Sequence, residues 1–277
     1  MKRIVTIQDI SCLGKCSITV ALPIISAMGI ETVILPTAVL STHTQFSGFT
    51  CADLENQIEP ISKHWKSINA DFDAIYTGYL ASVSQIELVK KFFQTFGKDE
   101  TLRFVDPAMA DNGKLYAGFD DSFPKSMAEL CGIADIIVPN LTEACLMTDT
   151  EYPDSYDEAF IRELLLKLAA LGTRKAVVIT GVTAEAGKTG VYGYNVQTGE
   201  FFNFSHKKES SSYHGTGDIF ASVTLGALEN GNSLEKSLKI AAKFTVDSIK
   251  ETVKNDKDKT YGVDFEPVIP ELIKQLA

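Results

Sequence analysis

The feature that most constrains the fold is a repeated alternation of short β-rich runs with amphipathic stretches. The runs are RIVTIQ, TVILP, DAIYTGYL, LRFVDPAM, ADIIVPN and KAVVITG. Between them stand segments with helical apolar spacing, among them SITVALPIISAMGI, SQIELVKKFFQTF and YDEAFIRELLLKLAALG. Such alternation is typical of βαβ units, and near-continuous apolar strands are typical of a sheet covered on both faces. The sequence therefore predicts an α/β fold with a mostly parallel central sheet and helices on both faces.

The pattern changes in the C-terminal half. The segment GKTGVYGYNVQTGEFFNFSH alternates apolar and polar residues around QTGE, which predicts an antiparallel β-hairpin. Two long helical patterns follow, DIFASVTLGALENG and SLEKSLKIAAKFTVDSIKETVK, and then a charged turn, NDKDKT, and a short terminal helix. No linker rich in Pro, Gly or Ser and no repeat interrupts the chain, so a single domain over residues 1–277 is expected.

Composition and charge exclude several classes of partner. The chain has 277 residues, 45% of them hydrophobic, which is enough to bury a core. The net charge of −10 argues against nucleic acid and against anionic membranes as partners, because both require a cationic face. The five cysteines are irregularly spaced and complete no zinc-ligand pattern, so they are expected to be reduced core thiols. With neither a long apolar segment nor a leader pattern, a cytoplasmic location is expected.

Polar residues follow the predicted strands, where an open parallel sheet binds its ligands. A single Asp after a strand is more often a helix cap or a turn former than a functional group. On one edge of one sheet, however, such residues together indicate a site. They are Gln8, Asp9, His43, Thr44, Tyr79, Asp106, Asp111, Asn140, Glu143 and Thr180.

The segment SSYHGTGDIFASV, residues 211–223, packs Gly215, Thr216, Gly217 and Asp218 directly before a helical pattern. Glycines allow a sharp turn and a close approach of the backbone to a ligand. The first amides of a helix have no internal partner and attract anions together with the helix dipole. Asp218 would lie beside that anion site, placed to accept a proton from a hydroxyl. The alternative is that Thr216 or Asp218 only caps the helix.

Two nucleotide-binding motifs are absent. GVTAEAGKTG resembles a P-loop, but six steps separate Gly181 from Gly187 where the motif needs five, and a strand pattern follows Lys188 where a helix is required. GTGDIF lacks the third glycine and the preceding βα context of a dinucleotide fingerprint.

Seven motifs in order resemble the ribokinase-like superfamily of small-molecule kinases, and within it the pyridoxal (vitamin B6) kinases. They are TIQD, STHTQFSGFT, TGYLAS, VDPAMAD, IIVPNLTE, VVIT and HGTGD, and the similarity extends over nearly the whole chain. The resemblance implies a ribokinase-like three-layer sandwich, a homodimer, and ATP-dependent phosphorylation of the hydroxymethyl group of pyridoxal, pyridoxine or pyridoxamine, with Mg²⁺ as cofactor.

The resemblance also carries roles onto matching positions. Asp218 matches the catalytic base, and Gly215, Thr216 and Gly217 match the anion hole for the transferred phosphoryl group. The candidate substrate-binding residues are Asp9, His43, Thr44, Gln45, Tyr79 and Asp218. The candidate ATP-binding residues are Asp106, Asp111, Tyr116, Asn140, Glu143, Thr180, Gly215 and Gly217, with Asp106 and Glu143 near the metal. Residues 111–119, DNGKLYAGF, match a flap over the nucleotide.

The chain departs from its relatives at Asp9, where related kinases often carry Ser. An anionic side chain suits a cationic ring nitrogen or an amine, so pyridoxamine and hydroxymethylpyrimidine both stay open as substrates. A sugar or nucleoside kinase of the same superfamily is a further alternative, but such enzymes usually carry a di-glycine where SCLGKCSITV has only Gly14. A non-enzymatic B6-binding protein is disfavoured by the intact Asp218 and loop glycines. A monovalent-ion requirement stays open.

Overall fold

A computed structural model describes residues 1–208, 213–255 and 259–276. Two predicted segments lie partly outside the described residues: 211–212 of the glycine segment and 256–258 of the charged turn. The chain forms two compact units. Unit 1 comprises Met1–Gly78, Thr95–Thr101 and Glu209–Ala277, and unit 2 comprises Tyr79–Gln94 and Leu102–Lys208. The single domain expected over residues 1–277 stays a prediction.

Unit 1 is built on a mostly parallel sheet with strand order β4-β1-β2-β3. Strands β1 (Arg3–Leu13), β2 (Glu31–Thr42) and β4 (Ala74–Thr77) are parallel, and β3 (Cys51–Asp53) pairs antiparallel with β2. The register of β1 on β2 shifts at one point, because Gln8 pairs with Pro36 whereas Ile10 pairs with Val39. Pro36 has no N–H to donate to the ladder, which favours an irregularity there.

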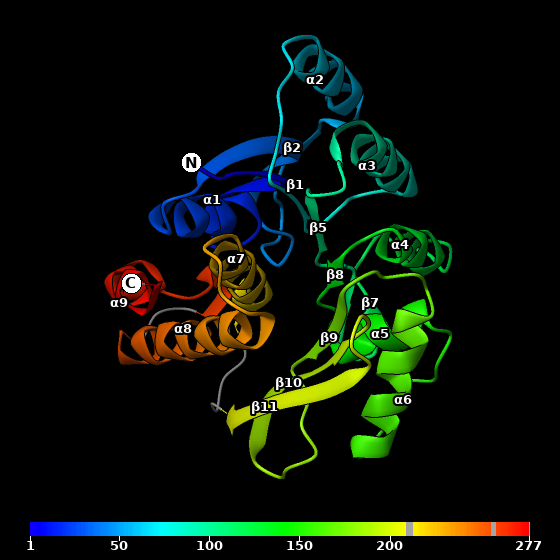
Figure 1. Ribbon diagram of the computed structural model, residues 1–277. Helices are drawn as coiled ribbons and strands as arrows, with labels where there is room; N and C mark the ends of the chain where they lie inside the picture. Colours follow the sequence, from blue (N-terminus) through cyan, green and yellow to red (C-terminus); the bar gives the residue numbers. More distant parts are fainter. Residues whose placement is uncertain (209–212, 256–258, 277) are drawn as a thin grey trace. The chain divides into compact units, whose positions relative to one another are not determined.

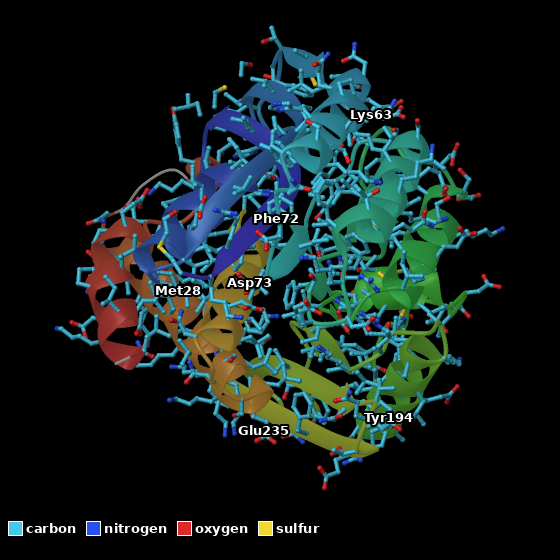
Figure 2. All side chains as sticks on the ribbon, turned by 45° about the horizontal axis from the view of Figure 1, so that its top comes forward. Met28, Lys63, Phe72, Asp73, Tyr194 and Glu235 are labelled. Carbon is cyan, nitrogen blue, oxygen red and sulfur yellow. The ribbon has the colours of Figure 1, made fainter. Side chains whose placement is uncertain are left out.

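The helices of unit 1 cover this sheet (Figure 1). Helices α1 (Ile18–Ala27), α7 (Thr216–Glu229) and α8 (Leu234–Lys254) gather on one side of β1 and β2, and α2 (Glu55–Ser67) lies on the other. The short helices η1 (Lys259–Tyr261), η2 (Glu266–Val268) and α9 (Ile269–Leu276) end the chain. Met28, labelled in Figure 2, packs against α7 at Gly226, where a Cβ atom would approach the Met28 sulfur to 2.5 Å. The small residue therefore allows α1 and α7 to pack closely.

The start of β4 is fixed by two adjacent side chains, Phe72 and Asp73 (Figure 2). The Phe72 ring packs at 5.7 Å from Trp65 and 5.4 Å from Phe96. Asp73 accepts a 2.8 Å hydrogen bond from the Arg3 N–H. Aromatic packing and one backbone hydrogen bond together hold β4 beside β1.

Unit 2 contains a mixed sheet with strand order β11-β10-β9-β8-β5. Strands β5 (Leu102–Val105), β8 (Ile136–Ile137) and β9 (Ala176–Thr180) are parallel, and β10 (Lys188–Asn195) and β11 (Glu200–Lys207) form the antiparallel hairpin. Its helices are α3 (Val83–Phe96, in most of its length), α4 (Phe123–Gly132), α5 (Leu141–Met147) and α6 (Glu158–Ala169). A separate small hairpin consists of β6 (Ala110–Asp111) and β7 (Lys114–Leu115).

The predicted strands, the long helices and the C-terminal-half hairpin are confirmed. The sequence did not predict β3, α2, α5 or the β6–β7 hairpin. Helix α2 has Pro60 inside it and buries Ile58 alone, so it shows little apolar periodicity. Helix α5 has seven residues, too few for a clear period. Among the described residues, no helix is long and apolar enough to span a membrane.

Candidate active site

Gly215 forms the left-handed turn that starts helix α7. It is the N-cap residue, with φ +74°, and Thr216, Gly217 and Asp218 occupy the first helical turn. A Cβ atom at Gly215 would collide with the carbonyl oxygen of Lys15. Both the backbone angle and the lack of space therefore require glycine at 215. Gly217, by contrast, lies within the helix, so the conformational demand falls on the first glycine of the pair and not on the second.

The turn presents the amides of α7 to an incoming anion. Over the residues that the structure describes, no side chain caps the helix at Gly215. The Thr216 hydroxyl donates to the Tyr213 carbonyl at 3.1 Å, so Thr216 stabilises the turn rather than capping the helix. Uncapped first-turn amides and the helix dipole are the features that attract an anion, so the predicted anion site at this turn stays a prediction.

Asp218 lies in the same first turn, and desolvation raises its pKa to about 7. This value already includes two smaller effects: the backbone N–H of Ser17 donates to Asp218 and lowers its pKa, and the nearby carboxylate of Asp9 raises it. The backbone of Ser17 has φ 51°, an angle that residues other than glycine rarely adopt. Strained backbone geometry of this kind gathers at functional sites. Asp218 thus combines a pKa close to neutral with a strained neighbouring backbone.

Asp9 lies within β1, at the register shift between Gln8 and Ile10, and is 4% exposed. Its carboxylate accepts a 2.8 Å hydrogen bond from the Ser11 hydroxyl and a further one from the Ser17 side chain. Burial is the main cause that raises the pKa of Asp9. The sequence placed Asp9 at the end of the first strand; the structure brings it within electrostatic range of Asp218.

His43 follows β2 and ties its loop to the C-terminal segment. Its Nδ1 accepts from the Gln45 N–H at 3.4 Å, so its Nε2–H donates to the Thr260 carbonyl at 2.7 Å. The ring also stacks on His214 at 5.2 Å. With 6% exposure, His43 is held by protein contacts, whereas Thr44 and Gln45 are exposed. These contacts fix the His43 ring in its loop, while Thr44 and Gln45 are accessible to a ligand.

In unit 2, the candidate ATP residues gather around the start of α5. Asn140 caps this helix: its Oδ1 accepts from the Glu143 N–H at 3.0 Å, and its Nδ2 donates to the Ala110 carbonyl at 2.8 Å. Asn140 also forms a parallel bridge with Thr180. The structure thus brings Asn140, Glu143 and Thr180 together, as the sequence analysis expected.

Glu143 is buried, at 3% exposure, and both of its carboxylate oxygens accept backbone hydrogen bonds. One accepts from Met109 at 3.1 Å and the other from Asn140 at 2.9 Å. Burial raises its pKa to about 8. Asp106, at 8% exposure, follows β5. The charges of Glu143 and Asp106 both raise the pKa of the buried Cys131 thiol, so the two carboxylates lie near the same side chain. Mg²⁺ prefers oxygen ligands such as carboxylates, so Asp106 and Glu143 are chemically suited to this ion.

The predicted flap, residues 111–119, begins with the β6–β7 hairpin. Its turn places Asn112 at φ 51° and Gly113 at φ 75°, the conformations of a tight hairpin turn. Gly113 donates its N–H to the Thr142 hydroxyl of α5 at 3.0 Å. Asp111 accepts two hydrogen bonds from Asn112, and Tyr116 is 40% exposed. The hairpin is therefore anchored to the helix that Asn140 caps.

Tyr79 opens unit 2 directly after Gly78. It is half-buried, and its ring lies 5.6 Å from Phe119 at the end of the flap segment. Phe119 in turn stacks on Phe123 at 3.8 Å. The predicted substrate residue Tyr79 is thus linked through Phe119 to the segment that carries Asp111 and Tyr116.

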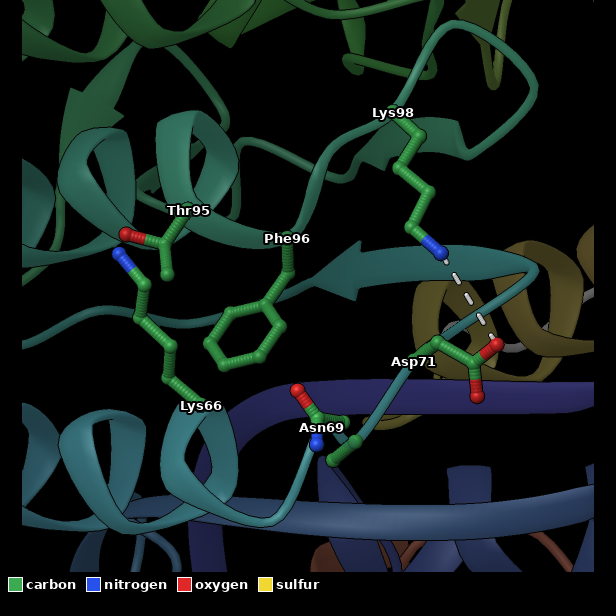
Figure 3. A pocket seen from close by; sticks show the side chains of 7 residues that line it. Lys66, Asn69, Asp71, Thr95, Phe96 and Lys98 are labelled. Atoms are coloured by element: carbon green, nitrogen blue, oxygen red, sulfur yellow. Dashed lines mark ion pairs between the residues drawn. The ribbon is translucent and has the colours of Figure 1, made fainter.

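A cavity of about 220 Å³ lies elsewhere in unit 1, between the end of α2 and residues 95–98 (Figure 3). Phe96 faces it, and Lys98 pairs with Asp71 at 3.9 Å across its edge. None of the candidate site residues lines this cavity.

The sequence analysis missed Ser17 and Lys15, the residues that contact Asp218, Asp9 and Gly215. Ser17 carried one weak signal, because Ser often precedes a helix. Nothing in the sequence indicated that the Ser17 backbone would turn to donate to Asp218, or that the Lys15 carbonyl would pack on Gly215.

Comparison with known proteins identifies the family. The phosphomethylpyrimidine kinase family model matches residues 18–262. A phosphomethylpyrimidine kinase candidate from Bacteroides thetaiotaomicron gives a TM-score of 0.95 at 39% identity and covers 98% of this chain and 93% of its own. An orthorhombic form of that protein with pyridoxal gives a TM-score of 0.93. Pyridoxal kinase from Lactobacillus plantarum gives 0.91 at 30% identity over 99% of this chain and 97% of its own.

A kinase that acts on a different substrate is also similar to the chain. The hydroxymethylpyrimidine/phosphomethylpyrimidine kinase of Bacillus subtilis is 23% identical over 205 residues, which cover 74% of this chain and 71% of the relative. The predicted ribokinase-like α/β fold is confirmed by the similarities over nearly the whole chain. The chain belongs to the phosphomethylpyrimidine kinase family and, within the ribokinase-like superfamily, to the pyridoxal kinases, which are phosphotransferases with an alcohol group as acceptor.

Proposed function

We propose that the protein transfers the γ-phosphoryl group of ATP to the 5′-hydroxymethyl group of pyridoxal, pyridoxine or pyridoxamine. The observation that carries the proposal is the pairing of Asp218, with a pKa of about 7, with the left-handed Gly215 turn at the start of α7. A base and an anion site on one helical turn suit the transfer of a phosphoryl group to a hydroxyl. The similarity to the Lactobacillus plantarum pyridoxal kinase and to a protein crystallised with pyridoxal supports the substrate class.

On the acceptor side, Asp218 takes the proton of the substrate hydroxyl as the hydroxyl oxygen attacks the γ-phosphorus. The bond between the γ-phosphorus and the bridging oxygen breaks, and ADP leaves. The carboxylate form is the one able to accept this proton, and a pKa near neutral balances basicity against ionisation. The first amides of α7 then stabilise the charge on the transferred phosphoryl oxygens. Removal of one such donor typically costs about 3 kcal/mol of transition-state stabilisation. The side chains proposed to contact the substrate ring are Asp9, His43, Thr44, Gln45 and Tyr79.

On the nucleotide side, Asn140, Thr180, Asp111 and Tyr116 are proposed to bind ATP. Asp106 and Glu143 would hold Mg²⁺, which neutralises phosphate charge when it is bound. Because both oxygens of Glu143 already accept amide hydrogen bonds, we expect Glu143 to contact the ion through water. The anchored β6–β7 hairpin is proposed to cover the nucleotide and exclude water, which would otherwise compete as acceptor.

We also propose that the protein forms a homodimer and is located in the cytoplasm. The resemblance to the pyridoxal kinases supports the dimer. The five cysteines are all free, which is in keeping with a reducing compartment. Only Cys131 and Cys145 are buried, so the expectation of core thiols was wrong for the exposed Cys12 and Cys51.

A panel of acceptors tests the proposed function. ADP formation is measured with ATP and Mg²⁺ for pyridoxal, pyridoxine, pyridoxamine, hydroxymethylpyrimidine and ribose. We expect the highest kcat/KM with a B6 vitamer and no activity above background with ribose. Preference for ribose would show that the chain is a sugar kinase, and ADP formation that does not depend on an acceptor would contradict kinase activity.

Hydroxymethylpyrimidine phosphorylation is the second candidate function. The buried carboxylate of Asp9, close to Asp218, favours it because it can accept a hydrogen bond from the amino group of a pyrimidine. The similarity to the Bacillus subtilis enzyme supports the same activity. In the panel, a kcat/KM for hydroxymethylpyrimidine above that of all three vitamers would select this function.

Asp9→Ser is expected to change the ranking of substrates. A charge-assisted hydrogen bond contributes about 1.5–3 kcal/mol, and a neutral one about 1 kcal/mol. If Asp9 pairs with the ammonium of pyridoxamine, the variant loses more kcat/KM with pyridoxamine than with pyridoxal; if it pairs with the ring nitrogen, all vitamers weaken alike. Measurement of kcat/KM for three vitamers on both proteins separates the two. An unchanged ranking at full catalytic efficiency would remove Asp9 from the substrate site.

The pH dependence of kcat/KM is expected to follow the ionisation of Asp218. Activity should rise with pH through about 7, as Asp218 loses its proton. The Asp9 carboxylate raises the pKa of Asp218, so Asp9→Asn should move the inflection to lower pH. Cys16, the other titratable neighbour, stays a neutral thiol because burial raises its pKa. Substrate ionisations are common to both proteins, so the shift between the two profiles is the test. Coincident inflections would show that Asp9 does not act on the base.

A further inference from the structure

The loop between β1 and α1 is held by the C-terminal segment 260–266, which follows it by some 250 positions in the chain. Lys15 makes most of the contacts. Its N–H donates to the Tyr261 carbonyl at 3.0 Å. Its ammonium pairs with Asp264 and with Glu266, each at 2.7 Å, and the Lys15–Asp264 pair spans 249 positions. The ammonium also lies 5.6 Å from the centre of the Phe265 ring.

Asp264 is the buried partner in the ion pairs of Lys15. Its side chain is 5% exposed, whereas that of Lys15 is 24% exposed. The second carboxylate oxygen of Asp264 accepts from the Asn255 side chain at 2.9 Å, and its N–H donates to the Thr252 hydroxyl at 2.7 Å. Both partners lie at the end of α8. A buried carboxylate held in this way is a strong anchor for a cation.

The backbone of Lys15 lies between two glycines. At Gly215, a Cβ atom would collide with the Lys15 carbonyl oxygen. At Gly262, where φ is +91°, a Cβ atom would press on the Lys15 Cβ and carbonyl oxygen at 3.0 Å each. The position of Lys15 therefore sets the space available to the Gly215 turn. A continuous series of contacts runs from α8 through Asp264 and Lys15 to the turn that starts α7.

We propose that Lys15 is a positioning residue for phosphoryl transfer: its ion pairs with Asp264 and Glu266 hold the Gly215 turn in the conformation that binds the transferred group. The proposal rests on the function proposed above. Lys15 acts through the backbone of Gly215, and its own charge is engaged by the two carboxylates. Small displacements of groups that position a reacting centre cost large factors in rate, of the order of 10²-fold for about 1 Å.

Lys15→Met tests the proposal, because methionine keeps an unbranched stem of similar length and removes the charge. We expect kcat to fall about tenfold or more with the KM for ATP within about twofold. Hydrogen exchange in a peptide covering residues 213–220 should become several-fold faster, since the turn loses its support. The matched control is Lys63→Met, which removes an exposed ion pair with Glu59 in α2 and should change neither quantity.

The double variant Lys15→Met/Asp264→Asn separates positioning from a simple loss of stability. Lys15→Met alone leaves a buried carboxylate without its cation, which lowers stability. Asp264→Asn removes that stranded charge and keeps an oxygen for Asn255. We expect the double variant to regain thermal stability while kcat stays low and exchange at 213–220 stays fast. Recovery of wild-type kcat in the double variant, or wild-type kcat and exchange in Lys15→Met, would overturn the proposal.

The exchange measurement keeps this proposal separate from the proposed function. If the wild-type protein phosphorylated none of the acceptors in the panel, the proposed function would fail. Hydrogen exchange at 213–220 would still show whether Lys15 holds the Gly215 turn, and unchanged exchange in Lys15→Met would remove the structural basis of the inference.

Discussion

Asp218→Asn is expected to lower kcat by about 10²–10⁴-fold, the range typical of a lost general base. Asn has nearly the same shape and cannot accept the proton of the substrate hydroxyl at neutral pH. The fold and ATP binding should be retained, because Asn removes a charge whose desolvation is unfavourable, as the raised pKa of about 7 indicates. The measurements are kcat with the best vitamer, the Kd for ATP, and the thermal midpoint.

The same substitution tests the alternative role of Asp218 as a helix cap. Asn is as good an N-cap residue as Asp, so a capping role alone predicts a variant with full stability and full turnover. The structure already assigns the N-cap position to Gly215 and places Asp218 inside the first turn. Near-normal turnover of Asp218→Asn at neutral pH would contradict the assignment of the base.

Gly215→Ala is expected to abolish measurable kinase activity. The methyl group would collide with the Lys15 carbonyl oxygen, and φ +74° is unfavourable for alanine by about 1–2 kcal/mol. The loop would have to move, and the first amides of α7 would lose their position at the phosphoryl group. The measurements are kcat, and hydrogen exchange over residues 213–220 as a readout that does not depend on activity.

Gly231→Ala is the matched control for Gly215→Ala. Gly231 has φ +82° and nothing within 4 Å of an added Cβ atom, so it carries the same backbone strain without the collision. It follows the C-terminal end of α7, while Gly215 starts that helix. We expect the control to lose a little stability and to keep its turnover. Equal activity of the two variants would show that the Gly215 turn is not needed for catalysis.

Much of the fold was predictable because its strands are apolar runs. RIVTIQ buries every residue after Arg3, and KAVVITG buries its apolar residues 176–179. An apolar run of this type indicates a parallel strand without further information. Helix α2 gave no such signal, since its one buried residue, Ile58, leaves no periodicity to detect. Helix α5 is short, and its start depends on a capping box between Asn140 and Glu143 that the apolar pattern does not show.

Some residues of the candidate site could likewise be predicted from the sequence, and others could not. Asp218 and Gly215 could be proposed because a glycine-rich turn before a helix has a known chemical consequence at the helix start. The support for that turn could not be predicted: Lys15 meets Asp264 across 249 positions, and sequence patterns carry no information on such pairs. The same holds for Ser17, whose φ of 51° follows from the packing around it and not from its residue type. The role of His43 as a substrate contact stays a prediction, and its bond to Thr260 is a further contact that the sequence did not indicate.

The most direct test of the central claim identifies the product of the reaction with pyridoxal. Wild-type protein is incubated with ATP, Mg²⁺ and pyridoxal, and the products are followed by phosphorus NMR. The account predicts a new phosphomonoester signal split by the two protons of a CH₂ group, formed in equal amount with ADP. Formation of inorganic phosphate and ADP without this signal would contradict it, as would unchanged ATP signals with pyridoxal when a parallel incubation with ribose converts ATP to ADP.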